Sequence, residues 1–271
     1  MDTELKVIKN DMPTELKGVN FSSDNQTGDE FKPPKPLKLS PQCLYIVGGV
    51  GSGKTSLWMN LLHKKGSKIR GKNKHHSRFL YKCFDKVYMM SASLGTMDRK
   101  KIKIPEHQVY DSYNAETLQQ IIDEEKEDEE NNRVLILLDD VIKDVNNSKD
   151  RDSETTLCKA ILNRRHCTIN EDGGKGGGLH IMITSQKYNF LPYSVMCNIS
   201  QLVLFRTNNA KEKRNIYEEY GQDLSWSGFN SILDYCWAEP HSFLFLDINE
   251  PTERKYYKRF DLIVIPKSYL S

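Results

Sequence analysis

The chain has 271 residues, of which 38% are hydrophobic and 28% charged, with a formal net charge of +2. This composition excludes fibrous and disordered classes and predicts one substantial core with a solvated surface. No run of about 18 apolar residues occurs, and the N-terminus lacks the apolar stretch of a signal peptide, so we expect no transmembrane segment. A charge so close to balance excludes a strong overall field, and net charge alone therefore gives no reason to expect a nucleic-acid partner.

The first part of the chain differs in composition from the rest. Residues 1–42 show no sustained apolar periodicity and end in a segment rich in proline and lysine, residues 31–36. Such a composition favours extended or disordered chain. We therefore predict a flexible N-terminal tail over residues 1–42 and a single domain over residues 43–271.

Short apolar runs alternate with helical stretches through the rest of the chain. The apolar runs predict strands at residues 44–47, 87–90, 134–138, 180–183, 202–205, 243–246 and 262–265. Helices are predicted at residues 56–62, 115–129, 154–162, 211–220 and 228–236. Unbroken apolar strands suit a parallel sheet that is covered on both faces. The alternation predicts an α/β fold, a three-layer sandwich around a mostly parallel central sheet.

A glycine-rich loop follows the first predicted strand. Its sequence, Gly-Gly-Val-Gly-Ser-Gly-Lys-Thr at residues 48–55, fits the phosphate-loop pattern G-x-x-x-x-G-K-[ST] between a strand and a helix. Glycines let backbone N–H groups face a phosphate, and the helix N-terminus attracts the same anion. Lys54 is expected to bridge the β- and γ-phosphates of ATP, and the Thr55 hydroxyl to bind Mg²⁺. The predicted nucleotide-binding residues are Gly48, Gly49, Val50, Gly51, Ser52, Gly53, Lys54, Thr55 and Ser56.

Two carboxylates, Asp139 and Asp140, end the predicted strand at residues 134–138. This is the pattern of a Walker B strand, in which Asp139 would hold the magnesium shell and Asp140 would take a proton from the attacking water or orient it. A second acid beside the metal ligand favours hydrolysis over transfer to a positioned acceptor. Asp140 is shorter than the commoner Glu, so it could act through an intervening water, or the two residues could have exchanged roles.

Three further polar residues are candidates for the reaction. Gln186 follows the strand at residues 180–183 and would orient water if that strand lies beside the Walker B strand. Arg164 and Arg165 close a helix, and one of them could stabilise transition-state charge in a neighbouring subunit. Cations near a helix C-terminus are also favourable without any catalytic role.

A basic stretch between Lys64 and Lys86 is a second kind of candidate. It carries nine Lys and Arg residues against the single acid Asp85. DNA would be contacted mainly through its phosphates, for which such a stretch is suited. A solvated loop with no ligand is the equally open alternative.

Together the phosphate loop, the Asp139-Asp140 ending, Arg165-His166 and residues 184–188 resemble one family. The sequence resembles the genome-packaging ATPases of nucleocytoplasmic large DNA viruses and virophages, the poxvirus-type branch of the FtsK/HerA superfamily. The resemblance covers about residue 43 to the C-terminus. It implies a RecA-like ASCE core, a homo-oligomeric ring, and ATP-driven translocation of double-stranded DNA into a preformed capsid.

The same resemblance assigns roles and partners. Lys54, Thr55, Asp139, Asp140 and Gln186 match the nucleotide motifs of the family. Sequence-independent DNA binding, capsid or portal-vertex partners, and a location in the host cytoplasm at the viral factory are implied, with the virion as a second location. Where the family is expected to carry an arginine, this chain has methionine, at position 196, so the trans-acting arginine is assigned to Arg164 or Arg165.

Two other functions fit the phosphate loop. One is a P-loop kinase acting on a nucleotide or another small acceptor, and the other is a slow, nucleotide-gated structural protein of an assembly. The paired aspartates, the downstream Gln186 and the lack of an obvious arginine-rich lid segment weigh against the kinase. Steady hydrolysis without an acceptor, raised by duplex DNA, would separate the motor from the kinase. Burst kinetics without sustained turnover would favour the structural protein.

Overall fold

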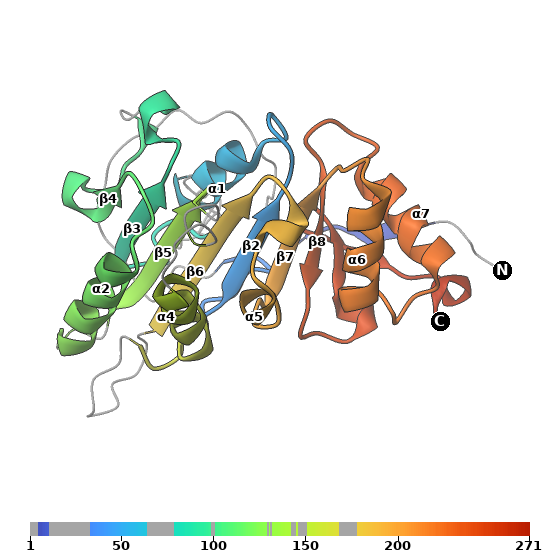
Figure 1. Cartoon of the computed structure of the whole chain (residues 1–271). Coiled ribbons are helices and arrows are strands. Elements are labelled where there is room, and N and C mark those ends of the chain that lie inside the picture. Colours follow the sequence, from blue (N-terminus) through green and yellow to red (C-terminus); the bar gives the residue numbers. More distant parts are fainter. Residues whose placement is uncertain are drawn as a thin grey trace, which may run out of the picture.

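A ten-stranded mixed sheet with helices on both faces makes up the protein (Figure 1). The computed structural model describes residues 5–10, 33–63, 79–98, 101–128, 130, 132–141, 145, 151–167 and 178–271, with residues 151–153 as backbone only. Within these ranges, no helix combines the length and the apolar character needed to cross a membrane.

The strand order is β1-β10-β9-β8-β7-β2-β6-β5-β3-β4. The strands from β7 to β4 pair in parallel: β7 (Gln201–Phe205), β2 (Cys43–Val47), β6 (Gly178–Ser185), β5 (Arg133–Asp139), β3 (Lys86–Ser91) and β4 (Val109–Tyr110). The remaining strands add to β7 in antiparallel pairs: β8 (Phe243–Asp247), β9 (Tyr256–Lys258), β10 (Asp261–Val264) and β1 (Lys6–Ile8). We call β8, β9, β10 and β1 the antiparallel extension.

The α-helices lie on two sides of this sheet. One side carries α1 (Lys54–His63), and the other carries α2 (Ala115–Glu127), α4 (Arg151–Leu162), α5 (Tyr193–Met196), α6 (Ala210–Tyr220) and α7 (Trp226–Cys236) (Figure 1). Short 3₁₀ turns are η1 (Leu94–Thr96), η3 (Glu106–Gln108), η4 (Tyr188–Phe190), η5 (Thr252–Arg254) and η6 (Lys267–Tyr269).

Each face of the sheet has its own hydrophobic core. Along β2, the side chains of Cys43, Tyr45 and Val47 belong to the core under α2, α4, α6 and α7. Leu44 and Ile46 belong to the core under α1. Successive residues of a strand face opposite sides, so a strand buried on both faces must be apolar throughout. The predicted three-layer α/β fold with a mostly parallel central sheet is confirmed.

Every helix and strand expected from the sequence is present, with ends that shift by a few residues. Three strands were not expected, β1, β4 and β9, and each has only two or three residues. A run this short carries too little period-2 signal to stand out. Their existence depends on longer neighbours that supply backbone partners.

The N-terminal prediction is wrong for the part that the structure describes. In β1, Val7 pairs antiparallel with Ile263 of β10. Further along, Leu37 is buried, and Lys38 Nζ lies 2.7 Å from Asp247 Oδ2 and 3.1 Å from Glu250 Oε1. Residues 5–10 and 33–42 are therefore part of the domain, held by strand pairing and by a partly buried ion pair. Residues 1–4 and 11–32 lie outside the described residues.

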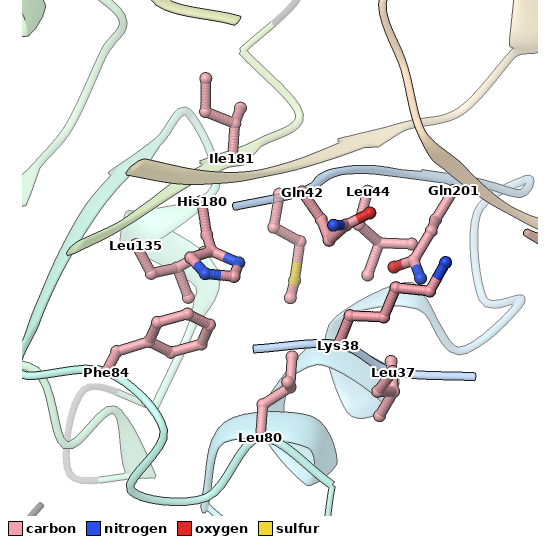
Figure 2. A pocket seen from close by; sticks show the side chains of 11 residues that line it. Leu37, Lys38, Gln42, Leu44, Leu80, Phe84, Leu135, His180, Ile181 and Gln201 are labelled. Atoms are coloured by element: carbon pink, nitrogen blue, oxygen red, sulfur yellow. The ribbon is translucent and has the colours of Figure 1, made fainter. Parts of the chain in front are cut away.

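The segment at residues 33–42 closes over one edge of the core beside His180 (Figure 2). The His180 Nε2 lies 3.0 Å from the Leu39 carbonyl, so Nε2 carries the proton and donates. The Phe84 ring packs edge-on against the imidazole at 4.8 Å. Burial lowers the pKa of His180 to about 4, the Leu39 carbonyl opposes that shift, and the cations Arg133 and Arg164 add to it.

Acidification is expected to destabilise the fold through His180. The unfolded chain binds this proton with a pKa of about 6.5, whereas the folded chain binds it only near 4. Stability is therefore lost as the pH falls from about 6.5 towards 4, by about 3 kcal/mol at most. Urea unfolding at about pH 7 and pH 4.5 measures the loss. His180→Gln, whose amide can still donate to Leu39, should lose less than the wild type, and an equal loss would contradict this assignment.

Candidate active site

The phosphate loop occupies the carboxyl end of β2 and the start of α1. Two of its glycines have left-handed backbone, Gly51 with φ +74° and Gly53 with φ +108°. At Gly48 a Cβ atom would lie 2.4 Å from Ser52 Oγ and 2.8 Å from Phe205 Cβ. The Gly48 N–H donates to the Ser185 carbonyl of β6 at 3.0 Å, which fixes the loop to the sheet. Only glycine suits these positions without strain or collision.

Two side-chain donors of the loop, the Lys54 ammonium group and the Ser52 hydroxyl, are suited to bind an anion. The Lys54 side chain is buried, and its Nζ donates to the carbonyls of Gly48 at 2.7 Å and Gly49 at 3.4 Å. The Ser52 Oγ is buried and has no hydrogen-bond partner in the described part of the chain. Solvent reaches the outer side of the loop at Gly49, Val50, Gly51 and Ser56. Buried polar groups are normally satisfied, so a phosphate on this loop fits the residues that are present.

Gly48 is not expected to tolerate even a methyl side chain. Gly48→Ala places a methyl group against Ser52 and Phe205, so we expect ATP affinity to fall by about tenfold or more, at roughly 1–3 kcal/mol for overpacking. Gly95→Ala is the control, because Gly95 is exposed in η1, outside the loop, and no atom lies within 4 Å of its new methyl group. Fluorescent-nucleotide titration of both variants, with melting temperatures, tests the prediction. Equal affinities would contradict it.

Asp139 ends β5 and is almost completely buried, with 1% of its surface exposed. Its Oδ1 accepts from the Thr184 hydroxyl at 2.8 Å, and its Oδ2 accepts from the Ser91 hydroxyl at 3.1 Å. The three residues face one another because β6 and β3 flank β5 in register. Burial raises the pKa of Asp139 and the charge of Asp140 adds to this, while the hydroxyl donors oppose it.

Asp140 turns the chain directly after β5. It has left-handed backbone with φ +55°, and its N–H donates to Thr184 Oγ1 at 3.1 Å. Thr184 therefore contacts both members of the acidic pair. The Asp140 carboxylate is half-exposed and makes no hydrogen bond to a described residue. A carboxylate in this state can accept a proton from a water molecule.

A magnesium ion at this edge would need more than protein ligands. The described residues contain no group of three or more His, Cys, Asp or Glu side chains that could hold a metal ion. Mg²⁺ in nucleotide sites commonly uses one or two protein oxygens with phosphates and water. The half-exposed Thr55 on α1 and Asp139 on β5 fit that sparse set.

Trp58 on α1 packs in the same hydrophobic core as Leu137 of β5, the strand that Asp139 ends. It lies three residues after Thr55, which places both on one side of α1. Its indole N–H is close enough to Asp139 to lower the pKa of that carboxyl group, although it does not form a hydrogen bond with it. The first turns of α1 therefore lie over the end of β5, as a shared metal would require.

The strand order decides where Gln186 lies. β6 runs between β2 and β5, with Asp139 paired to Thr184 and Val47 to Ser185. Gln186 follows directly and is exposed at the same edge as the phosphate loop. Gln186 was predicted to orient water only if the strand before it lies beside the Walker B strand. β6 does lie beside β5, so this condition is met.

Arg164 and Arg165 lie at the other end of β6. The Arg164 carbonyl accepts from the Leu179 N–H at the start of that strand. Its guanidinium donates to the carbonyls of Ile161 at 2.7 Å and Pro41 at 3.2 Å. Arg165 is exposed. Neither meets the phosphate loop of its own chain, so action in a neighbouring subunit stays a prediction.

The basic stretch at residues 64–86 is only partly described. Residues 64–78 lie outside the described residues. At its far end, Lys86 Nζ lies 3.0 Å from Glu125 Oε1 and 2.8 Å from Asp128 Oδ2. Lys86 is thus paired within its own chain, and a DNA surface along this stretch stays a prediction.

Two residues near the loop were not expected from the sequence. Arg206 follows β7, the strand on the far side of β2 from β6, and is exposed. His241 precedes β8, and its Nδ1 lies 3.0 Å from the Ser52 carbonyl. Arg206 could have been found from the sequence, because it is a basic residue directly after an apolar strand. His241 could not have been found from a local pattern, because the residue that it contacts, Ser52, is 189 positions away in the sequence.

No family model and no curated protein sequence matches the chain. Among solved structures, the fold is similar to that of B204, the DNA-packaging ATPase from Sulfolobus turreted icosahedral virus. That alignment has a TM-score of 0.51 and 13% identity, and it covers 84% of this chain and 98% of B204.

Two other structures align less closely. B204 from Sulfolobus turreted icosahedral virus 2 in complex with ATP-gammaS has a TM-score of 0.48 at 12% identity, covering 83% of this chain and 98% of that one. The pCW3 conjugation coupling protein TcpA with ATPgS has a TM-score of 0.46 at 12% identity, covering 83% and 61%. At this identity the similarity to the first structure shows a shared P-loop ATPase fold, which confirms the fold predicted from the sequence.

Proposed function

We propose that this protein is an ATP-hydrolysing motor that moves double-stranded viral DNA into a capsid during virion assembly. The observation that carries the proposal is the meeting of the phosphate loop, Gln186 and the acidic pair at the carboxyl ends of three adjacent parallel strands, β2, β6 and β5. Ligands of open α/β sheets bind at such an edge. The similarity to B204, whose fold the chain shares, adds support.

The residues of this edge divide the chemistry between them. Lys54 would exchange the carbonyls of Gly48 and Gly49 for the β- and γ-phosphates of ATP. The oxygen of a water molecule would attack the γ-phosphorus while Asp140 takes a proton from that water. The bond between the γ-phosphorus and the oxygen that bridges to the β-phosphate would break, which releases ADP and inorganic phosphate. Gln186 would orient that water. Bound Mg²⁺, held by Thr55 and Asp139, would neutralise charge on the phosphates.

As a motor, the protein acts on duplex DNA and together with other protein subunits. Duplex DNA is bound through its phosphates without regard to sequence, because a motor must pass every sequence. The protein acts as a homo-oligomeric ring at a capsid or portal vertex, in the host cytoplasm at the viral factory. In such a ring, Arg165 is free to reach a neighbouring site, whereas Arg164 would first have to leave the carbonyls that it binds.

Steady-state ATP hydrolysis with and without long duplex DNA tests the proposal. We expect DNA to raise the rate, and the rise to fade between about 50 and 200 mM salt as phosphate contacts weaken. Lys54→Ala serves as the blank. Hydrolysis that does not respond to DNA at either salt concentration would contradict a DNA motor and would direct the search to phosphoryl acceptors.

A further inference from the structure

The phosphate loop is contacted by a residue from the far end of the sequence. His241, in the turn between α7 and β8, has its Nδ1 3.0 Å from the Ser52 carbonyl. A carbonyl oxygen only accepts, so Nδ1 carries a hydrogen and donates it. The imidazole also covers Gly53, where a Cβ atom would lie 3.5 Å from Nδ1.

The turn that carries His241 is fixed within the antiparallel extension. Glu239 Oε1 lies 2.9 Å from Lys258 Nζ, and Glu239 Oε2 lies 3.3 Å from Arg259 Nη2. The Ser242 N–H donates to the Glu239 carbonyl at 3.2 Å. His241 itself has left-handed backbone with φ +56°, a conformation that most residues avoid. The position of the imidazole is thus set by β8, β9 and the turn.

The contact determines how one peptide of the loop is oriented. In a trans peptide the carbonyl of one residue and the N–H of the next point in opposite directions. A donor that holds the Ser52 carbonyl on the outer side therefore turns the Gly53 N–H to the opposite side. Loops that bind phosphates do so by directing successive N–H groups at the anion.

We propose that His241 is a positioning residue of the nucleotide site, which holds the Ser52–Gly53 peptide in its anion-binding orientation and links the antiparallel extension to the phosphate loop. The inference rests on the proposed nucleotide function of that loop. Its consequence is that a strand pair outside the parallel core takes part in phosphate binding. A residue of this kind affects ligand affinity more than the chemical step.

Three variants separate the hydrogen bond from the backbone conformation. His241→Asn keeps a donor at the same distance from the backbone and tolerates left-handed φ. His241→Gly keeps the conformation but lacks the donor, and His241→Ala lacks both. We expect the Gly and Ala variants to bind both ATP and inorganic tripolyphosphate about threefold to tenfold more weakly, as one hydrogen bond would predict. The Asn variant should recover most of the affinity.

Titration calorimetry with the two ligands, melting temperatures, and the separation of KM from kcat form the test. The expected loss lies in the dissociation constants and KM, with the melting temperature of the Gly variant close to that of the wild type. Wild-type affinity in the Gly variant would overturn the proposal. A loss for ATP alone would also overturn it, because the imidazole would then contact the nucleoside. Failure of the wild type to bind either ligand would overturn the proposed function itself.

Discussion

Asp140→Asn is expected to lower ATP turnover by at least about tenfold while nucleotide binding is retained, since general bases usually contribute 10² to 10⁴. The substitution removes the proton acceptor and little else. Asn tolerates the left-handed backbone that Asp140 adopts, and the N–H donated to Thr184 is unchanged. The loss should therefore appear in kcat and not in the dissociation constant for ATP.

A control and a second variant make this result specific. Asp234→Asn changes an exposed carboxylate on α7 and should leave turnover unchanged. Asp139→Asn should weaken magnesium-dependent binding, because Asp139 is the predicted metal ligand. Turnover at the wild-type rate in Asp140→Asn would remove it as the base. The opposite pattern, with turnover lost in Asp139→Asn and metal dependence lost in Asp140→Asn, would show that the two residues have exchanged roles.

Lys54→Ala is expected to weaken ATP binding by at least about a hundredfold. The ammonium group would make charge-assisted contacts to two phosphates, each worth roughly 1.5–3 kcal/mol. In the free protein the same group is held by the Gly48 and Gly49 carbonyls, so it is already close to the loop that it serves. Titration calorimetry at saturating magnesium measures the loss.

The control for Lys54 is another lysine with no part in the site. Lys211 is exposed at the start of α6, and Lys211→Ala should bind ATP as the wild type does. Melting temperatures show whether the Lys54 variant is folded, which matters because the side chain is buried. ATP affinity within about threefold of the wild type in folded Lys54→Ala would refute the phosphate-loop assignment.

The phosphate loop and the acidic pair could be predicted because their signals are local. Gly51 and Gly53 need left-handed backbone, and Lys54 begins a helix directly after them. The buried strand β5 likewise showed as an unbroken apolar run that ends in carboxylates. Residue types, spacing and flanking elements within a few positions were sufficient for both.

The surroundings of Asp139 could not be predicted in the same way. Ser91 and Thr184 reach its carboxylate only because β3 and β6 flank β5 in one register. Strand order and register depend on packing across the whole sheet, which no local pattern contains. The composition of the N-terminal segment also led to a wrong prediction of a flexible tail. β1 is a strand because it pairs with β10, more than 250 residues away in the sequence.

ATP-dependent movement along DNA tests the central claim most directly. A triplex-forming oligonucleotide bound near one end of a linear duplex is displaced only by a protein that travels along the DNA. We predict displacement by the wild type with ATP and magnesium, and strongly reduced displacement with Asp140→Asn. Hydrolysis that is stimulated by DNA without any displacement of the oligonucleotide would contradict translocation and would leave a DNA-dependent ATPase that does not move.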